Sequence, residues 1–326
     1  MSVDPLERRR LGQTAVSVPV LGLGTAPLGG WPTAVPREQG VATVQRAWDA
    51  GVRYFDTAPF YGHGNSEGFV GSVLAAQERE SFVLSTKVGR LLVPGTGASE
   101  LFAGTPPLEP VLDYSAEGTL RSLRESLDRL ELDRIDVAFI HDPDEHHEAA
   151  LEGAFSALAE LRAEGRLGAI GVGMNWSAPL ARFAREAAFD CFLLAGRYTL
   201  LEQGALDELL PAVAERGMSI VAGGVYNSGV LIDPRPGAHY DYAPAAPEVI
   251  ERAQALQVAC ALFDVPLRAA AIQFPLAHPA VASVVVGART PQEVDDNLAL
   301  LAVDIPAELW DALRERGLLR ADAPTP

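Results

Sequence analysis

The chain has 326 residues, 48% hydrophobic and 21% charged, so it can form a large core and is not a disordered chain, a collagen-like fibre or a small disulfide scaffold. Its 43 acidic and 26 basic side chains give a formal net charge of −17, which disfavours nucleic acids and anionic membrane surfaces as partners. The two cysteines have no motif spacing, and we find neither a signal peptide nor an apolar stretch of about 18 residues, so we expect a cytoplasmic protein.

Short apolar runs alternate with longer segments of helical periodicity along the whole chain. In chain order, the predicted strands are 20–23, 54–56, 82–87, 135–140, 169–172, 192–195, 219–222 and 283–286, and the predicted helices are 38–50, 66–77, 116–130, 153–164, 178–187, 205–216, 247–263 and 291–300. Eight strands that are each followed by a helix predict a (β/α)8 TIM barrel of the α/β class. No shift in composition divides the chain, so we expect one domain over residues 1–326, with a further helix at 306–316 and a frayed tail at 321–326.

Local signals support individual helices. In the predicted helix 116–130 the leucines recur every three or four residues, which predicts one buried stripe made of Leu120, Leu123, Leu127 and Leu130. Ser66, which is followed by Glu67, and Thr290, which is followed by Pro291, are typical of residues that begin a helix.

Two glycine pairs match the first two glycines of the dinucleotide-binding GxGxxG motif, but neither is followed by the third glycine. The third glycine position after Gly22 and Gly24 holds Pro27, and the position after Gly171 and Gly173 holds Trp176. The chain also contains no GxxxxGK[ST] motif. The sequence therefore argues against both a Rossmann site and a P-loop.

Polar side chains interrupt the predicted strands at their carboxyl ends. Asp56 ends the second strand, Lys87 ends the third, His141 follows the fourth, and Tyr61 lies in the loop after Asp56. In a barrel these ends meet at one mouth, where an ammonium group close to a phenol is expected to lower the tyrosine pKa. Any one of these residues alone is explained by a structural ion pair or a core histidine, but all four together suit proton transfer at a carbonyl or an alcohol.

Three segments that contain these residues, FDTAPFYGHGNSEGFVG, STKVGR and FIHDPDE, resemble the signature blocks of the aldo-keto reductases. The resemblance extends over about residues 11–300. It implies a (β/α)8 barrel that transfers hydride to or from NAD(P), with Asp56, Tyr61, Lys87 and His141 as the catalytic residues and Tyr61 as the general acid or base.

Further segments, DYSAEGTLRSLRESLDRLELDRIDVAFIHDPDEH, LLAGRYTLLEQ and NSGVL, are similar to the sugar-oxidising branch of that family. This resemblance implies oxidation of C1 of an aldose, of the L-fucose, L-galactose or D-arabinose type, to the lactone, with Tyr61 as base. Two alternatives stay open within the same chemistry: an NADPH-dependent carbonyl reductase and a pyridoxal 4-dehydrogenase. A third, of another class, is a dinucleotide-binding, redox-sensing regulatory subunit, against which the intact Tyr61 and Lys87 argue.

The resemblance also implies a site for the nicotinamide. Asn175 matches the residue that hydrogen-bonds the carboxamide, although the serine that usually precedes it is Met174. The glutamine expected after the sixth strand is replaced at Ala195, and the stacking aromatic expected after the seventh is replaced at Gly223. The aromatic residues that would compensate are Tyr198 and Tyr226.

The adenosine end is expected in the segment 287–297, which begins the last barrel helix. The residues assigned to the cofactor there are Gly287, Ala288, Arg289, Glu293 and Asn297. A carboxylate at Glu293 repels a 2′-phosphate and accepts a hydrogen bond from a ribose hydroxyl, so we expect a preference for NAD, with NADP still possible. Arg289 is the counter-argument, because a guanidinium can bind a phosphate.

The substrate is expected to be a small sugar or aldehyde, recognised mainly by the two long connections 88–113 and 223–246. Trp31, Phe60 and His63 lie in loops at the predicted mouth and are the candidate substrate contacts. The segment HDPDEHH, which begins at His141, resembles a metal cluster, but its side chains belong to a loop and lack HExxH spacing, so we expect no metal. The sequence leaves the oligomeric state open.

Overall fold

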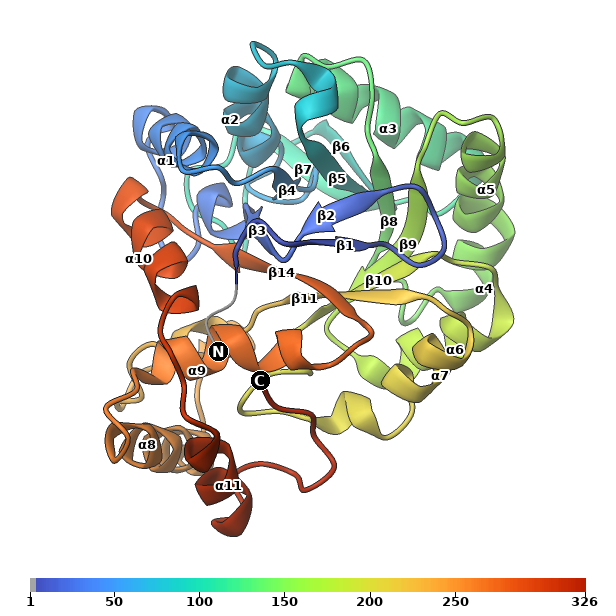
Figure 1. The fold of residues 1–326 in the computed structure, drawn as a ribbon. Coiled ribbons are helices and arrows are strands. Elements are labelled where there is room, and N and C mark those ends of the chain that lie inside the picture. Colours follow the sequence, from blue (N-terminus) through green and yellow to red (C-terminus); the bar gives the residue numbers. More distant parts are fainter. Residues whose placement is uncertain (1–3) are drawn as a thin grey trace.

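The computed structural model describes residues 4–326, and its central feature is a closed barrel of eight parallel strands surrounded by helices (Figure 1). In chain order the barrel strands are β3 (Leu21–Gly24), β4 (Tyr54–Asp56), β5 (Val83–Val88), β8 (Val137–His141), β9 (Ala169–Met174), β10 (Cys191–Ala195), β11 (Ser219–Gly223) and β14 (Val281–Gly287). Strand β14 pairs with β3, so the last strand closes the barrel against the first. The predicted (β/α)8 fold is confirmed. The near-continuous apolar runs form strands because the interior covers one face and helices cover the other.

The helices lie around the barrel as the alternating pattern predicts (Figure 1). They are α1 (Arg37–Asp49), α2 (Asn65–Leu74), α3 (Ala116–Leu130), α4 (His147–Ala149), a π-helical segment (Ala150–Phe155) that leads into α5 (Ser156–Ala163), α6 (Ser177–Glu186), α7 (Leu209–Glu215), α8 (Pro247–Ala261), α9 (Leu267–Gln273), α10 (Pro291–Leu301) and α11 (Ala307–Glu315). Sequence periodicity missed α9. This short helix is buried on nearly every side, so its sequence LRAAAIQ has no polar face that would show the helical period.

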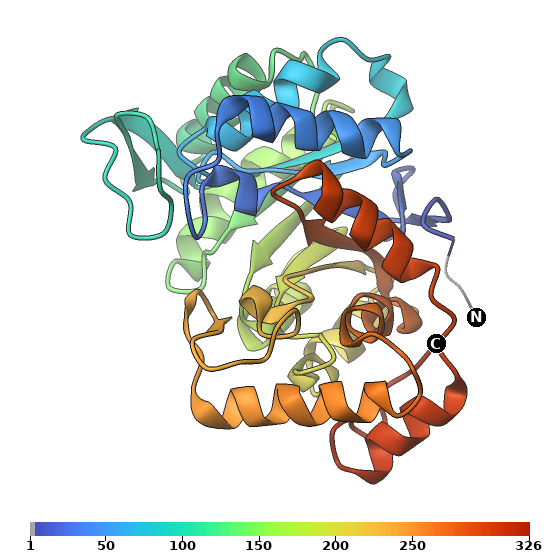
Figure 2. The same ribbon diagram turned by 90° about the vertical axis from the view of Figure 1, so that its left-hand side faces the viewer.

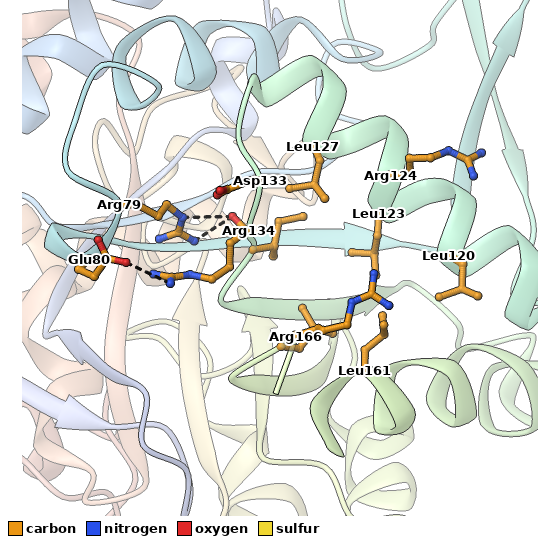
Figure 3. A pocket seen from close by; sticks show the side chains of 12 residues that line it. Arg79, Glu80, Leu120, Leu123, Arg124, Leu127, Asp133, Arg134, Leu161 and Arg166 are labelled. Carbon is orange, nitrogen blue, oxygen red and sulfur yellow. Dashed lines mark hydrogen bonds and ion pairs between the residues drawn. The ribbon is translucent and has the colours of Figure 1, made fainter. Parts of the chain in front are cut away.

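Helix α3 has the predicted bounds but not the whole predicted stripe. The hydroxyl of Ser115 accepts a hydrogen bond from Gly118 N and begins the helix. Leu123 and Leu130 are buried, but Leu120 is 46% exposed, so its predicted burial is wrong. Leu120 faces a surface groove between α3 and α5 (Figure 3).

The two helix starts expected at Ser66 and Thr290 have different outcomes. Thr290 caps α10 as predicted, accepting a hydrogen bond from Glu293 N. Helix α2 begins one residue earlier than predicted, at Asn65, and the buried hydroxyl of Ser66 instead donates to Thr25 Oγ1 at 2.6 Å.

A hairpin that precedes the barrel covers its amino-terminal end. It consists of β1 (Arg8–Arg10) and β2 (Ser17–Pro19), and it lies at the end of the barrel away from the long loops (Figure 2). The guanidinium of Arg9 donates to the carbonyl oxygens of Leu276 and Val281, at 2.8 and 2.9 Å. This hairpin was not expected from the sequence, because a run of three arginines has none of the apolar alternation of a strand.

The two long connections form ordered structure at the opposite end. The first contains a hairpin of β6 (Arg90–Pro94) and β7 (Leu108–Leu112), which projects from the barrel, and the second contains the short pair β12 (His239–Tyr240) and β13 (Ala243–Pro244) (Figure 2). Both follow the carboxyl ends of barrel strands, so they surround the mouth as expected.

The tail at residues 321–326 is packed, contrary to the frayed tail expected from the sequence. Ala323 is 2% exposed. Arg314, in α11, donates to the carbonyl of Ala323 at 3.0 Å and to the hydroxyl of Thr325 at 2.9 Å. These contacts hold the tail against the helix that precedes it. Among residues 4–326, no helix combines the length and apolarity needed to cross a membrane.

Candidate active site

Three of the polar residues predicted at strand ends meet inside the barrel mouth, and two of them form a buried ion pair. Lys87 Nζ donates to Asp56 Oδ2 at 2.7 Å and to the carbonyl of Thr57 at 3.0 Å. Asp56 Oδ1 accepts from the hydroxyl of Ser85 at 2.7 Å. The side chains of Lys87 and Asp56 are only 1% and 3% exposed, so nearly the whole pair is removed from water.

Tyr61 reaches this pair from the loop after β4. Its ring centroid lies 4.7 Å from Lys87 Nζ and 5.8 Å from the ring of His141. The loop is held by a close approach of two backbones, because a Cβ on Gly62 would lie 2.4 Å from the carbonyl oxygen of Gly29. Gly62 also has a φ of +64°, which favours glycine. The structure therefore brings Asp56, Tyr61, Lys87 and His141 together.

The pKa of Tyr61 differs from the expectation. Burial, and then the negative charge of Asp56, raise the pKa of Tyr61 well above its ordinary value. The positive charge of Lys87 does not offset these two effects, because the carboxylate of Asp56 at 2.7 Å partly compensates that charge. Burial, and then the positive charges of Lys87 and Arg90, lower the pKa of His141. At neutral pH the site therefore presents a phenol and an uncharged imidazole.

A small cavity of about 90 Å³ adjoins these groups. Phe60 and Asn175, both predicted site residues, line it together with Tyr61, Lys87 and His141. Sequence reasoning missed the other side chains in its wall: the lining also contains Leu101, Phe102, Asp142 and Tyr242. Three of these lie in the two long connections, which the sequence marked as substrate loops without indicating which residues face inward.

A larger cavity of about 310 Å³ shares Tyr61 and Tyr242 with the first and extends toward the last barrel helix. It is lined at its far end by Gly287, Arg289 and Glu293, the predicted adenosine contacts. Trp31 lines it too, and its ring lies edge-on to that of Tyr242, with the centroids 5.4 Å apart. Ala195 and Gly223, where the expected nicotinamide contacts are replaced, are also in the wall.

The wall of the larger cavity fits an extended dinucleotide. A Cβ on Gly287 would lie 2.6 Å from Pro27 Cγ, so any other residue at this position would clash with Pro27 and displace this part of the wall. Gly224 and Gly229 also line the cavity, and their φ values of +60° and +99° favour glycine, so this part of the wall carries no side chains. The Nε atom of Arg289 is buried with no hydrogen-bond partner among the described residues, so this guanidinium still has a donor to offer.

Side chains at the adenosine end are held by the start of α10. Glu293 Oε2 accepts from the backbone N–H of Arg289 at 2.7 Å, which leaves Oε1 for a ligand. The guanidinium of Arg289 donates to the carbonyl and the hydroxyl of Thr33. Ala288 packs in the core and Asn297 donates to the carbonyl of Gly287 at 3.2 Å; neither is among the residues that line the cavity.

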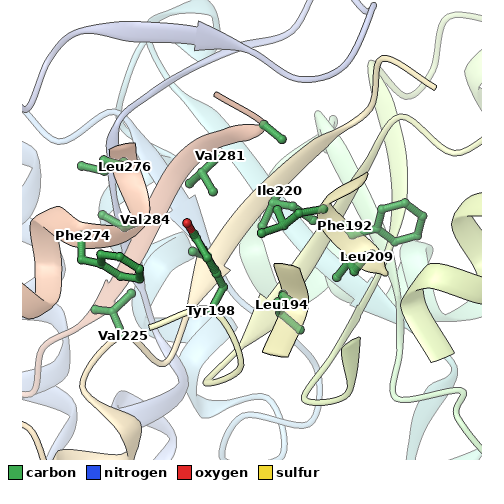
Figure 4. Close-up of a cluster of buried hydrophobic side chains, with 14 of the residues drawn as sticks. Phe192, Leu194, Tyr198, Leu209, Ile220, Val225, Phe274, Leu276, Val281 and Val284 are labelled. Atoms are coloured by element: carbon green, nitrogen blue, oxygen red, sulfur yellow. The ribbon is translucent and has the colours of Figure 1, made fainter. Parts of the chain in front are cut away.

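The two tyrosines considered as replacements for the nicotinamide contacts lie in different places. Tyr226 lines the larger cavity, and its hydroxyl donates to Asn297 Oδ1 at 3.0 Å. Tyr198 lies in the core outside the barrel, packed on Phe274 and among aliphatic side chains (Figure 4). Tyr198 therefore lines neither mouth cavity.

Two other histidines that the sequence singled out, His63 and His147, make structural contacts. His63, a predicted substrate contact, is buried, and its Nδ1 lies 2.8 Å from the carbonyl oxygen of Leu108; it lines neither cavity. His147, at the end of HDPDEHH, begins α4, and its Nε2 lies 2.6 Å from Glu186 Oε2. No group of three or more His, Cys, Asp or Glu residues in the described part of the chain is arranged to hold a metal.

Another cavity, of about 670 Å³, lies at the opposite end of the barrel and contains none of the predicted site residues. It is the groove between α3 and α5, bordered by the segments that precede β5, β8 and β9 (Figure 3). Arg79 and Arg134 at its edge are engaged: Arg79 donates to the carbonyl of Arg134, and Arg134 donates to Glu80. Because barrel active sites form at the carboxyl ends of the strands, we assign the catalytic chemistry to the mouth and not to this groove.

Comparison with known proteins agrees with this geometry. The model of the Aldo/keto reductase family matches residues 20–316. The chain is similar to a pyridoxal 4-dehydrogenase of Microbacterium luteolum (42% identity, 98% of this chain and 100% of that one) and to a D-threo-aldose 1-dehydrogenase of a Pseudomonas species (43% identity, 95% and 96%). Among solved structures, the holo form of an aldo-keto reductase from Bacillus halodurans has a TM-score of 0.77 at 25% identity and covers 98% of both chains.

Proposed function

Because this chain belongs to the aldo/keto reductase family of NAD(P)-dependent oxidoreductases, we propose that it is an NAD-dependent dehydrogenase that oxidises C1 of an aldose to the lactone. The observation that carries the proposal is the phenol of Tyr61 beside a buried Lys87–Asp56 pair and a neutral His141, at the junction of two cavities. The 43% identity to an aldose dehydrogenase over 95% of the chain supports the sugar as substrate.

The residues of the chain supply the proton half of this reaction. The other half would come from a bound dinucleotide, whose nicotinamide would supply the acceptor for the hydride. Tyr61 takes the proton from the substrate hydroxyl, and Lys87, close to the ring, stabilises the phenolate form in which Tyr61 acts as base. His141, uncharged because its pKa is lowered, orients the same oxygen by a hydrogen bond. Gly287, Arg289 and Glu293 would hold the adenosine end, and Asn175 would contact the nicotinamide end.

The reaction catalysed is tested by spectroscopy of the reduced nicotinamide. Purified protein with NAD should produce the near-ultraviolet absorbance of NADH when L-fucose, L-galactose or D-arabinose is added. Pyridoxal is the second candidate substrate, favoured by the 42% identity to a pyridoxal dehydrogenase and by the aromatic rings of Phe60 and Phe102 in the cavity wall. Turnover with pyridoxal and none with aldoses would show that the substrate is pyridoxal and not a sugar. No turnover with any sugar, aldehyde or pyridoxal would favour a dinucleotide-binding regulatory protein.

The rate of oxidation should rise with pH, because the base form of Tyr61 is scarce at neutral pH. Since burial raises the pKa of Tyr61 above its ordinary value of about 10, the phenolate fraction grows about tenfold per pH unit up to that point. We expect kcat/KM for oxidation, measured with limiting dinucleotide, to rise without a plateau below about pH 10, while reduction, which needs the phenol, stays level. A plateau in the oxidation profile below about pH 9 would show that the Lys87 charge outweighs burial.

The preference for NAD is expected to depend on Glu293. Its carboxylate lines the cavity, where it repels a 2′-phosphate and accepts a hydrogen bond from a ribose hydroxyl. The Glu293→Gln variant keeps an oxygen that can accept the backbone N–H of Arg289, and it should shift the ratio of kcat/KM for NAD to that for NADP toward NADP by about tenfold, or about 1.4 kcal/mol. Glu308→Gln, the same change at an exposed position in α11, should leave the ratio unchanged. Wild-type protein that prefers NADP would contradict the assignment.

A further inference from the structure

A second ion pair lies beside the catalytic residues, and the chemistry described so far does not use it. Arg90 Nη2 donates to Asp142 Oδ2 at 2.9 Å. The two side chains are 21% and 31% exposed, so the pair is partly removed from water, and Asp142 lines the small cavity next to Tyr61 and His141. Burial raises the pKa of Asp142 from its usual range, and the neighbouring Arg90 opposes that shift.

Backbone contacts fix the position of Asp142. Its N–H donates to the carbonyl of Gly173 at 3.0 Å, and the hydroxyl of Tyr114 donates to the carbonyls of both His141 and Asp142, at 2.7 and 2.8 Å. Asp142 also has a φ of +44°, a conformation that aspartate adopts at a cost. This arrangement directs the carboxylate toward His141, with 3.6 Å between Asp142 Oδ2 and His141 Nε2.

Arg90 holds the carboxylate from the other side. Its guanidinium lies over the ring of Phe60, with Cζ 4.6 Å from the ring centroid. Among the described residues, nothing donates a hydrogen bond to Asp142 Oδ1, so a fixed carboxylate with an unused acceptor faces the cavity. Because the Asp142 side chain is 31% exposed, this oxygen is open to solvent, and a substrate hydroxyl that enters the cavity can take the place of water on it.

We propose that Asp142, positioned by Arg90, accepts a hydrogen bond from the substrate hydroxyl on the carbon next to the reacting carbon. In the proposed function, on which this inference rests, the reacting oxygen binds between Tyr61 and His141. Because the carboxylate lies 3.6 Å from the same His141 nitrogen, the nearest substituent it can reach is the one on the adjacent carbon. The site thus selects polyhydroxylated substrates. A pocket built to bind a hydroxyl rejects the analogue that lacks it more strongly than an apolar pocket does.

The test compares an aldose with its 2-deoxy counterpart, L-fucose and 2-deoxy-L-fucose, in wild type and in two variants. Asp142→Gly removes the carboxylate and tolerates the positive φ, and Asp142→Asn keeps a weaker acceptor. For L-fucose we expect kcat/KM to fall about 10- to 100-fold in Asp142→Gly and less in Asp142→Asn, mostly through KM. For the 2-deoxy sugar both variants should stay within about threefold of wild type. Asp144→Asn, an exposed acid two residues away, is the matched control.

The outcomes separate the two proposals. A loss confined to the hydroxylated sugar supports the role of Asp142. Equal losses with both sugars overturn it and leave the dehydrogenase function standing, because wild type still oxidises the aldose. Wild-type protein that oxidises no aldose overturns both, and this result is visible before any variant is made.

Discussion

Replacing Tyr61 by phenylalanine is expected to lower kcat by about 10²- to 10⁴-fold, the usual contribution of a positioned acid or base. The substitution removes the hydroxyl proposed to exchange the proton with the substrate oxygen but keeps the ring against Lys87 and His141. Dinucleotide binding should therefore stay within about twofold of wild type, because binding does not need the proton. Steady-state kinetics gives kcat, and quenching of tryptophan fluorescence by NADH gives the affinity.

The matched control is Tyr198→Phe. The hydroxyl of Tyr198 is buried in the core with no hydrogen-bond partner among the described residues, so its removal should change neither turnover nor dinucleotide binding (Figure 4). A Tyr61→Phe enzyme with near-normal kcat would show that another group carries the proton. A loss of dinucleotide binding equal to the loss of kcat would instead make Tyr61 a binding residue.

The second large effect is expected from the ion pair of Lys87 and Asp56. Asp56→Asn leaves a buried ammonium without its carboxylate, which typically costs about 3–5 kcal/mol of folding free energy. The same variant loses the group that orients Lys87 toward the ring of Tyr61, so kcat should fall as well. Urea denaturation followed by circular dichroism measures the first effect, and turnover of the folded fraction measures the second.

A double variant separates stability from chemistry. Asp56→Asn combined with Lys87→Met removes both charges and should recover a substantial part of the lost folding free energy, because no uncompensated charge stays buried. Activity should not return, because the cation next to Tyr61 is gone. If the double variant regained activity along with stability, the pair would be structural only.

The sequence predicted structure best for the barrel strands, whose residues are buried on both faces. The strands of the barrel could be found because both of their faces are covered, and Asp56, Lys87 and His141 stood out because they are polar residues at the ends of such runs. The same reasoning found no signal for helix α9 or for the β1–β2 hairpin. The first is buried on nearly every side and the second consists of short polar strands, so neither carries a hydrophobic period.

The rest of the site depends on which way individual side chains point, and periodicity does not determine this for loops. His63 was expected to contact the substrate and is instead held by the carbonyl of Leu108, whereas Tyr242 and Asp142, which were not singled out as contacts within their marked segments, line the cavity. The direction of the Tyr61 pKa shift was missed for a related reason. Sequence shows which charges are neighbours, but the pKa depends on how much water burial removes and on whether the neighbouring charge is already paired.

The hairpin that covers the amino-terminal end of the barrel is made first, but it reaches its final position only after the last barrel strand has been synthesised. Arg9 binds carbonyls at Leu276 and Val281, so this cover cannot form until most of the chain has been made. Contacts between residues so distant in sequence have a high loop-closure cost and slow folding. Until then Leu11 and Val18, which are buried in the finished barrel, lack part of their packing, and exposed apolar surface of this kind makes a partly folded chain prone to aggregate.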